Sequence, residues 1–140
     1  MAVHFYESVE DSLLKFAVIV AKYHGQYVFC KHKDRDTLEV AGGHREPNED
    51  IETTAKRELR EETGAIDFDI KPVCVYSVTE PHNFDGKETF GMLYFAEIKS
   101  FESTLHYEIE KIVLSNTLPT NWTYPTIQPF LMQKVFDLIS

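Results

Sequence analysis

The sequence predicts an α/β fold in which a mixed β-sheet is flanked by helices. Short apolar runs rich in β-branched and aromatic residues alternate with hairpin-length loops, and two segments show the apolar spacing of amphipathic helices. At 140 residues the chain has the usual size of one domain, and 43% hydrophobic residues are enough to bury a core. We therefore expect residues 1–140 to form a single domain.

Strands are predicted where apolar runs are bounded by turn-forming residues. The expected strands cover residues 16–23, 27–31, 38–41, 71–79, 89–98 and 109–114. A turn at 24–26 joins the first two as a hairpin, and residues 80–87 form a polar loop. Gly42 and Gly43 are expected to break regular structure before the first helix.

Both helices are predicted from capping residues and apolar spacing. Asn48 or Asp50 can cap a helix that runs to about Thr63, and Gly64 suits the left-handed residue that commonly ends one. The closing helix is expected to place a single apolar stripe against the sheet. That stripe consists of Ile127, Phe130, Leu131, Val135 and Leu138.

The first helix carries carboxylates where apolar residues are expected. Ile51 and Ala55 begin an apolar face, yet Glu58 and Glu62 fall on nearly the same stripe, with Glu61 beside them. Like charges at this spacing destabilise a helix by about 0.2 to 0.5 kcal/mol per pair, and the C-terminal end of a helix is itself negative. A divalent cation would reverse both penalties, and oxygen ligands favour Mg²⁺, then Mn²⁺.

A solvated acidic face offset by Arg57 and Arg60 is the alternative interpretation of these glutamates. The flanking residues favour the functional one. Over residues 43–65 the sequence reads G-x5-E-x7-R-E-L-R-E-E-T-G-A. This pattern resembles the complete Nudix box, which is long and specific enough to identify the chain as a member of the Nudix hydrolase family.

The resemblance to MutT-like Nudix hydrolases implies both a fold and a chemistry. The implied fold is an α/β/α sandwich with a mixed β-sheet, and the implied reaction is hydrolysis of a nucleoside diphosphate linked to another group, with Mg²⁺ or Mn²⁺. By this resemblance Glu58, Glu61 and Glu62 are the metal ligands, and the Gly43 carbonyl often completes the shell.

Further site residues follow from the same resemblance. Glu49 and Arg57 are expected to form the supporting pair that fixes the loop onto the helix, because a guanidinium fork suits a carboxylate and cannot bind a metal. Many family members add one more carboxylate, as ligand or base, from a later loop. Glu108 is the candidate for this role, with Glu97, Glu102 and Glu110 as alternatives.

Basic residues just before the box are candidate substrate contacts. Lys31, Lys33 and Arg35 lie in the stretch 31–35, and His44 follows Gly43 directly. They are interpreted as a phosphate or ribose clamp, with a solvated hairpin end as the alternative. The segment 32–35, followed shortly by Gly42 and Gly43, is similar to those of bacterial 8-oxo-dGTP diphosphatases and RNA 5′-pyrophosphohydrolases.

Aromatic side chains provide surfaces on which a nucleobase could stack. The available rings are Tyr27, Phe84, Trp122 and Tyr124, and core packing is the alternative role for each of them.

Composition limits the partners. A formal net charge of -9 disfavours long nucleic acid, which gains no counterion release on an acidic surface. The longest apolar run, 16–21, is too short to span a membrane, and the acidic start of the chain is unlike a secretory signal. Cys30 and Cys74 make no metal spacing and are expected to be buried reduced thiols of a cytoplasmic protein, either a monomer or a homodimer.

The sequence therefore favours a Mg²⁺-dependent diphosphohydrolase acting on a nucleoside triphosphate or an oxidised one such as 8-oxo-dGTP. An RNA 5′-pyrophosphohydrolase is one alternative, in which the diphosphate belongs to a transcript. A non-catalytic module that senses a nucleotide is the other. Such modules typically lose a ligand glutamate or the arginine of the box, and none is lost here.

Overall fold

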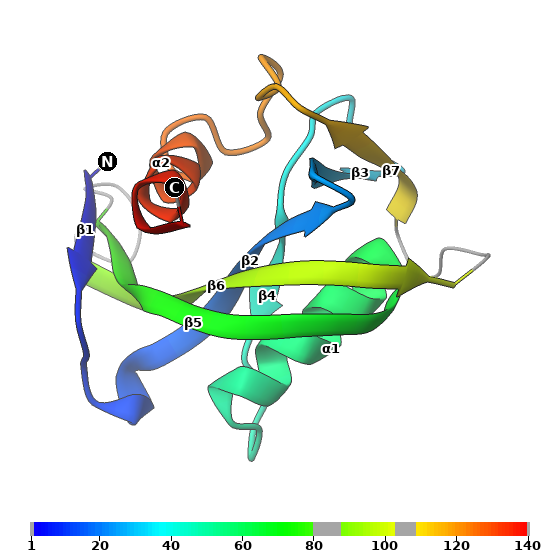
Figure 1. The fold of residues 1–140 in the computed structure, drawn as a ribbon. Coiled ribbons are helices and arrows are strands. Elements are labelled where there is room, and N and C mark those ends of the chain that lie inside the picture. Colours follow the sequence, from blue (N-terminus) through cyan, green and yellow to red (C-terminus); the bar gives the residue numbers. More distant parts are fainter. Residues whose placement is uncertain (1, 80–87, 103–108, 140) are drawn as a thin grey trace.

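The computed structural model describes residues 2–79, 88–102 and 109–139, in which a mixed sheet lies between two helices (Figure 1). Helix α1 (Ile51–Thr63) packs on one face of the sheet, and helix α2 (Gln128–Ile139) packs on the other. This arrangement confirms the predicted α/β/α sandwich.

The sheet contains seven strands in the order β1-β5-β6-β2-β3-β7, with β4 also pairing with β2. The strands are β1 (Ala2–Tyr6), β2 (Leu14–Tyr23), β3 (Gln26–His32), β4 (Ala41–His44), β5 (Ala65–Thr79), β6 (Glu88–Phe101) and β7 (Ile109–Ser115). A short 3-10 helix, η1 (Asp11–Leu13), precedes β2. The β2–β6 pair is parallel and the other pairs are antiparallel, so the sheet is mixed as predicted.

Strand β2 is apolar on both faces because each face of the sheet is covered by a helix. Its Ala17 and Ile19 belong to the core under α1, whereas Val20 belongs to the core under α2. The alternation of side chains along a strand produces this division. It explains why residues 16–21 form the longest apolar run in a chain without a membrane-spanning helix among its described residues.

The strand predicted at 38–41 begins only at Ala41, after isolated bridges at Leu38 and Glu39, and the predicted break at Gly42 and Gly43 is wrong. Both glycines lie inside β4, where they pair with Val18 and Ala17 of β2. A Cβ atom at Gly42 would lie 2.7 Å from the Ala17 carbonyl oxygen. Glycine therefore permits a close approach of two strands here rather than ending one.

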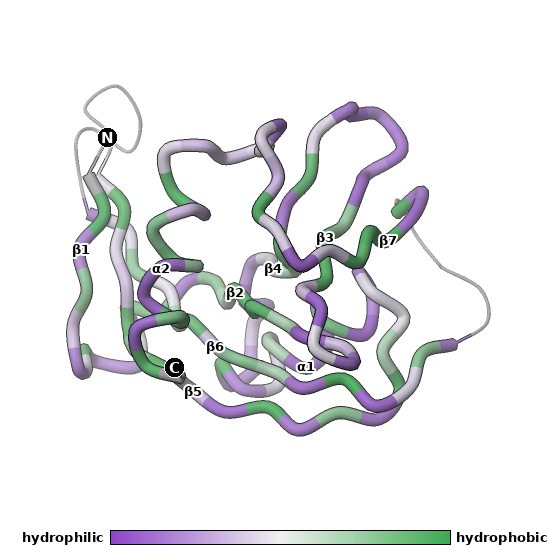
Figure 2. The backbone as a smooth tube through the Cα atoms, turned by 45° about the horizontal axis from the view of Figure 1, so that its top comes forward, coloured by the Kyte–Doolittle hydropathy of each residue, from purple (hydrophilic) through white to green (hydrophobic). Residues whose placement is uncertain are grey.

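Strand β5 begins at Ala65 rather than at residue 71, and β1 was not predicted at all. Figure 2 shows hydrophilic and hydrophobic residues alternating along β5. Alternation of this kind in residues 65–70, as in Asp67-Phe68-Asp69-Ile70, is the signal of a strand with one solvated face. Strand β1 is short and is held by its pairing with β5.

Two expectations about individual side chains need correction. On α2, Leu131 and Val135 are buried as predicted, but Phe130 and Leu138 are more than half exposed. Phe130 is turned about 100° from Leu131, and Leu138 lies in the last turn of the helix. Both cysteines are free, as expected, but only Cys30 is fully buried.

Candidate active site

Helix α1 is fixed at both ends by local interactions that its sequence supplies. The Asp50 carboxylate accepts the Thr53 N–H at 2.8 Å as the N-cap. Gly64 adopts a left-handed φ of 78°, and its N–H donates to the Arg60 carbonyl at 2.9 Å. Ile51, Ala55 and Leu59 bury the apolar face against the sheet. The acidic residues of the last turns are thereby held in place.

Arg57 clamps the loop before α1 onto the helix. Its Nε donates to one Glu49 oxygen at 2.8 Å, and its Nη2 donates to the other at 3.0 Å. The same Nη2 donates to the His44 carbonyl at 3.1 Å, and the Thr54 hydroxyl donates to Glu49 at 2.7 Å. These hydrogen bonds, those from Arg57 first, lower the pKa of Glu49 to about 2. The structure thus places the predicted supporting pair in direct bidentate contact.

Arg57 also reaches the first two predicted metal ligands. Its Nη1 lies 2.7 Å from a Glu58 oxygen and 3.4 Å from a Glu61 oxygen. The Glu58 side chain is only 13% exposed, and burial raises its pKa despite the opposing effect of Arg57. The single positive charge of Arg57 is therefore shared among the carboxylates of Glu49, Glu58 and Glu61.

Glu62 is held by the backbone of β4. One of its oxygens accepts the Gly42 N–H at 2.7 Å, and the other lies 3.2 Å from His32 Nε2. Burial, with the nearby carboxylates Glu58 and Glu39, raises the pKa of Glu62 to about 8. A buried carboxylate among other carboxylates is an environment that favours a bound cation.

The side chains at the end of α1 fit a divalent metal ion. Glu58, Glu61 and Glu62 offer only oxygen donors, which suit Mg²⁺ or Mn²⁺. Gly43 abuts this cluster, because a Cβ at that position would collide with the Glu58 carboxylate. Any side chain at position 43 would therefore displace Glu58, one of the predicted ligands.

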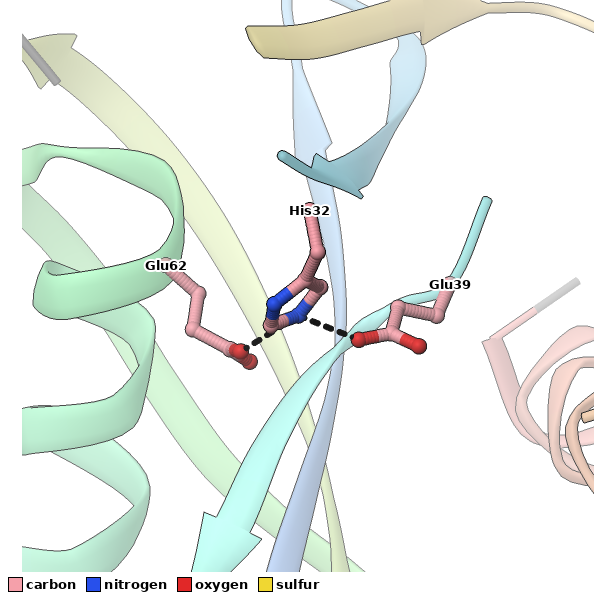
Figure 3. Close-up of side chains that lie close together, drawn as sticks. All are labelled: His32, Glu39 and Glu62. Carbon is pink, nitrogen blue, oxygen red and sulfur yellow. Dashed lines mark ion pairs between the residues drawn. The ribbon is translucent and has the colours of Figure 1, made fainter. Parts of the chain in front are cut away.

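A second cluster, not predicted from the sequence, joins His32, Glu39 and Glu62 (Figure 3). His32 ends β3 and lies between the two carboxylates, with Nε2 2.5 Å from Glu39 and 3.2 Å from Glu62. Glu39 is buried and also pairs with Arg35 at 3.3 Å. No pattern in the sequence joins His32 and Glu39, because β3 and the segment before β4 come together only in the sheet.

This cluster has the residue types of a metal site, and its ligand atoms lie within 4.8 Å of one another. The 2.5 Å separation of His32 Nε2 and Glu39 is nevertheless short for two ligands of one ion. Ligands bonded at about 2.1 Å in tetrahedral or octahedral geometry are about 3 Å or more apart. The distance fits a direct contact of the imidazole with Glu39 better than coordination of an ion by both.

A cavity of about 380 Å³ opens beside these residues. Its polar lining includes His32, Glu39, Gly43, Glu62 and Gln128, and its apolar lining includes Phe16, Tyr76, Ile127 and Leu131. A mostly apolar cavity with a few polar groups is typical of a small-molecule site. The carboxylate Glu62 thus belongs both to the acidic cluster and to the cavity wall.

The predicted substrate contacts divide into two groups. Arg35 and His44 line the cavity. Lys31 and Lys33 are not among its lining residues: Lys31 pairs with Glu110 at 3.1 Å, and Lys33 is exposed. Their role in substrate binding stays a prediction.

The predicted extra carboxylate, Glu108, lies outside the described residues. Among its alternatives, which the structure does describe, none lines the cavity; these are Glu97, Glu102 and Glu110.

The candidate stacking rings also divide. Trp122 packs edge-on against Phe29 with ring centroids 5.6 Å apart, and Tyr27 packs against Phe136. Tyr124 is 42% exposed and lines the cavity. Phe84 lies outside the described residues. Of the three candidate stacking rings that the structure describes, only Tyr124 is both well exposed and placed at the cavity.

Comparisons with known proteins agree with this geometry. The family model of the NUDIX domain matches residues 12–113. The Bacillus subtilis protein YtkD, to which the activity of an 8-oxo-dGTP diphosphatase is ascribed, is 33% identical over 122 residues. That match covers 85% of this chain and 73% of the relative.

Solved structures show the same architecture. A crystal structure of the Bacillus subtilis pyrophosphohydrolase BsRppH superposes with a TM-score of 0.79 at 25% identity, covering 98% of this chain and 91% of that one. A NUDIX hydrolase from Nitrosomonas europaea has a TM-score of 0.67 at 22% identity, with 89% and 88% of the two chains covered. The box, the fold and these matches together lead to one conclusion: the chain belongs to the Nudix family, whose hydrolases act on diphosphate bonds.

Proposed function

We propose that this Nudix hydrolase cleaves the diphosphate linkage of a nucleoside triphosphate or of an oxidised form such as 8-oxo-dGTP, with Mg²⁺ or Mn²⁺. The observation that carries the proposal is that Glu62 and Gly43 of the box also line the cavity. Chemistry at the box would therefore act on a ligand that the cavity holds. The similarity to YtkD at 33% identity supports the choice of substrate.

Glu58, Glu61 and Glu62 would hold the metal ion, with the Gly43 carbonyl as a further ligand. When bound, the cation neutralises the diphosphate oxygens and activates the attacking water. Arg57 fixes the orientation of Glu58 through its 2.7 Å contact, and the Gly42 N–H fixes Glu62 at 2.7 Å. Such prior positioning lowers the cost of reaching the reactive geometry.

Arg35 and His44 are the lining residues best suited to contact phosphate or ribose oxygens, because both can offer N–H donors. Lys31 and Lys33 would act at a greater distance, by attraction of the anionic substrate to an otherwise acidic protein. Glu108 remains the proposed additional carboxylate.

An RNA 5′ end is the second candidate substrate. The structural similarity to the pyrophosphohydrolase BsRppH, with a TM-score of 0.79, favours it. The net charge of -9 argues against long contacts with RNA, so recognition would be limited to the terminal nucleotides.

Release of phosphate or diphosphate from a panel of substrates tests this proposal. The panel contains GTP, ATP, 8-oxo-dGTP, ADP-ribose and a 5′-triphosphorylated oligonucleotide, each with Mg²⁺ and with EDTA. We expect metal-dependent turnover of the nucleoside triphosphates or of 8-oxo-dGTP. Turnover of the oligonucleotide alone would favour the RNA alternative, and nucleotide binding without any turnover would favour a sensing module.

We also infer a cytoplasmic protein that is a monomer or a homodimer. Light scattering on the purified chain and fractionation of expressing cells check these two statements. A stable tetramer, or recovery in a membrane fraction, would contradict them.

A further inference from the structure

Gln128 is a buried polar residue at the wall of the cavity. It is the first residue of α2, and it is only 6% exposed. Its Oε1 accepts the Val40 N–H at 2.9 Å, which ties α2 to the chain just before β4. Helix and sheet are thus joined at a point where both line the cavity.

This hydrogen bond determines which end of the Gln128 amide remains available. A backbone N–H can only donate, so the atom facing Val40 must be the amide oxygen. The other end is then the NH₂ group, a donor of two hydrogen bonds. Within the part of the chain that the structure describes, no acceptor is recorded for this NH₂ group. It is therefore the group that Gln128 can offer to a ligand in the cavity.

We propose that Gln128 selects the nucleobase, by donating from its NH₂ group to the carbonyl oxygen of a 6-oxopurine such as guanine. The inference rests on the proposed function, because it assumes that a nucleotide occupies the cavity. Guanine presents two acceptors, O6 and N7, on one edge, whereas adenine presents the N6 amino donor in place of O6. Oxidation of guanine at C8 leaves O6 unchanged.

The surroundings of Gln128 suit the rest of a purine. Ile127 lies beside it on the cavity wall, together with Phe16 from β2, and both are partly exposed and offer apolar surface to a ring. The cavity, at about 380 Å³, is in the size range of small-molecule sites.

The distance to the proposed metal site is also suitable. Val40, which holds Gln128, is three residues from Gly43, so their Cα atoms are at most about 10 Å apart. A base at Gln128 and phosphates at Gly43 and Glu62 could then belong to one nucleotide, because all three residues line the same cavity.

The substitution Gln128→Glu tests the proposal with little change in shape. A carboxylate can still accept the Val40 N–H, but its second oxygen is an acceptor in place of the NH₂ donor. Initial-rate measurements of kcat/KM with GTP, inosine triphosphate and ATP would be made on the wild type and the variant. Gln133→Glu is the matched control, because Gln133 lies on the same helix, is exposed and does not line the cavity.

The wild type is expected to prefer GTP and inosine triphosphate over ATP by about tenfold or more, since a buried donor left unpaired discriminates strongly between substrates. Inosine triphosphate keeps O6 but lacks the 2-amino group, so it should behave like GTP. In Gln128→Glu the ratio of GTP to ATP should fall at least about tenfold, whereas Gln133→Glu should keep the wild-type ratio.

An unchanged ratio in a folded Gln128→Glu protein would overturn the inference, and so would equal use of all three nucleotides by the wild type. If Gln128→Glu does not fold, the comparison of GTP with 2-aminopurine riboside triphosphate, which lacks O6, makes the same test on the wild type. Hydrolysis of no nucleotide by the wild type would instead refute the proposed function, so the two failures are distinguishable.

Discussion

Glutamates at the two ends of helix α1 have pKa values shifted in opposite directions. At the N-terminal end, Glu49 receives hydrogen bonds from Arg57 and Thr54, and its pKa falls to about 2. At the C-terminal end, Glu62 is buried near Glu58, and its pKa rises to about 8. The protein's own hydrogen bonds stabilise the negative charge at the N-terminal end, which we call the satisfied end. The negative charge at the C-terminal end, the acidic end, is not stabilised to the same extent.

This difference assigns separate tasks to the two ends. The satisfied end holds the loop before α1 in position, together with the end of β4 at His44. The acidic end keeps an unfavourable arrangement of like charges that a cation would relieve. Arg57 contacts carboxylates at both ends, so it connects the rigid part of the site to the reactive part.

The largest expected effect comes from the acidic end. Glu61→Gln or Glu62→Gln should each lower kcat by about 10³-fold, because a positioned metal supplies several kcal/mol of transition-state stabilisation. Tm should stay the same or rise, since each substitution removes a repelled charge. Glu52→Gln, an exposed change in the first turn of the same helix, is the control for both readouts. Retained activity in both ligand variants would refute the assignment.

Arg57→Lys should have an intermediate effect on both ends. Lysine keeps the charge but cannot make the bidentate contact with Glu49 or reach the His44 carbonyl at the same time. We expect kcat/KM to fall by about 10- to 100-fold, and the free energy of unfolding to fall by about 1–3 kcal/mol. Steady-state kinetics and urea unfolding measure the two losses. A loss of activity at unchanged stability would contradict the assignment of both tasks to Arg57, namely holding the loop before α1 and orienting the acidic end.

His32→Leu should weaken the acidic end more mildly. The change removes the imidazole that lies between Glu39 and Glu62, so Glu62 would keep only its contact with the Gly42 N–H. We expect the affinity for Mn²⁺, measured on the protein without substrate, to fall by about tenfold. His32→Gln, which retains a donor, should restore part of that affinity. Equal affinity in all three proteins would show that His32 does not position Glu62.

The smallest effect is a pH dependence of stability at the satisfied end. Because the pKa of Glu49 is about 2 in the folded protein against an ordinary value of 4.5, the unfolded chain binds more protons between these values. The stabilisation is therefore complete above about pH 4.5 and is lost as the pH falls towards 2. The Tm difference between the wild type and Glu49→Gln should shrink over that range. A difference that stays constant from pH 6 to pH 2.5 would contradict the assigned pKa.

Local features of the site were predictable from the sequence. The Asp50 cap, the Gly64 terminus and the apolar face of α1 depend on residues within one helix, and the structure has each of them. The Nudix box was readable for the same reason, because all its positions lie within 23 consecutive residues. Its ends, Gly43 and Ala65, lie in the strands that precede and follow the helix, β4 and β5.

Features that depend on the sheet were not predictable. Gly42 and Gly43 indicated a break, but their pairing with β2 places them in a strand. Gln128 and Val40 are 88 residues apart, and their hydrogen bond exists only because the helix and sheet meet at the cavity. A pattern within a short window carries no information about such a contact.

Binding of Mn²⁺ to the substrate-free protein, followed by electron paramagnetic resonance, tests the comparison of the two helix ends most directly. We expect the wild type and Glu52→Gln to bind Mn²⁺ alike, and the double variant Glu61→Gln/Glu62→Gln to bind it at least about 100-fold more weakly. Wild-type affinity in the double variant would contradict the claim that the acidic end of α1 is the metal site.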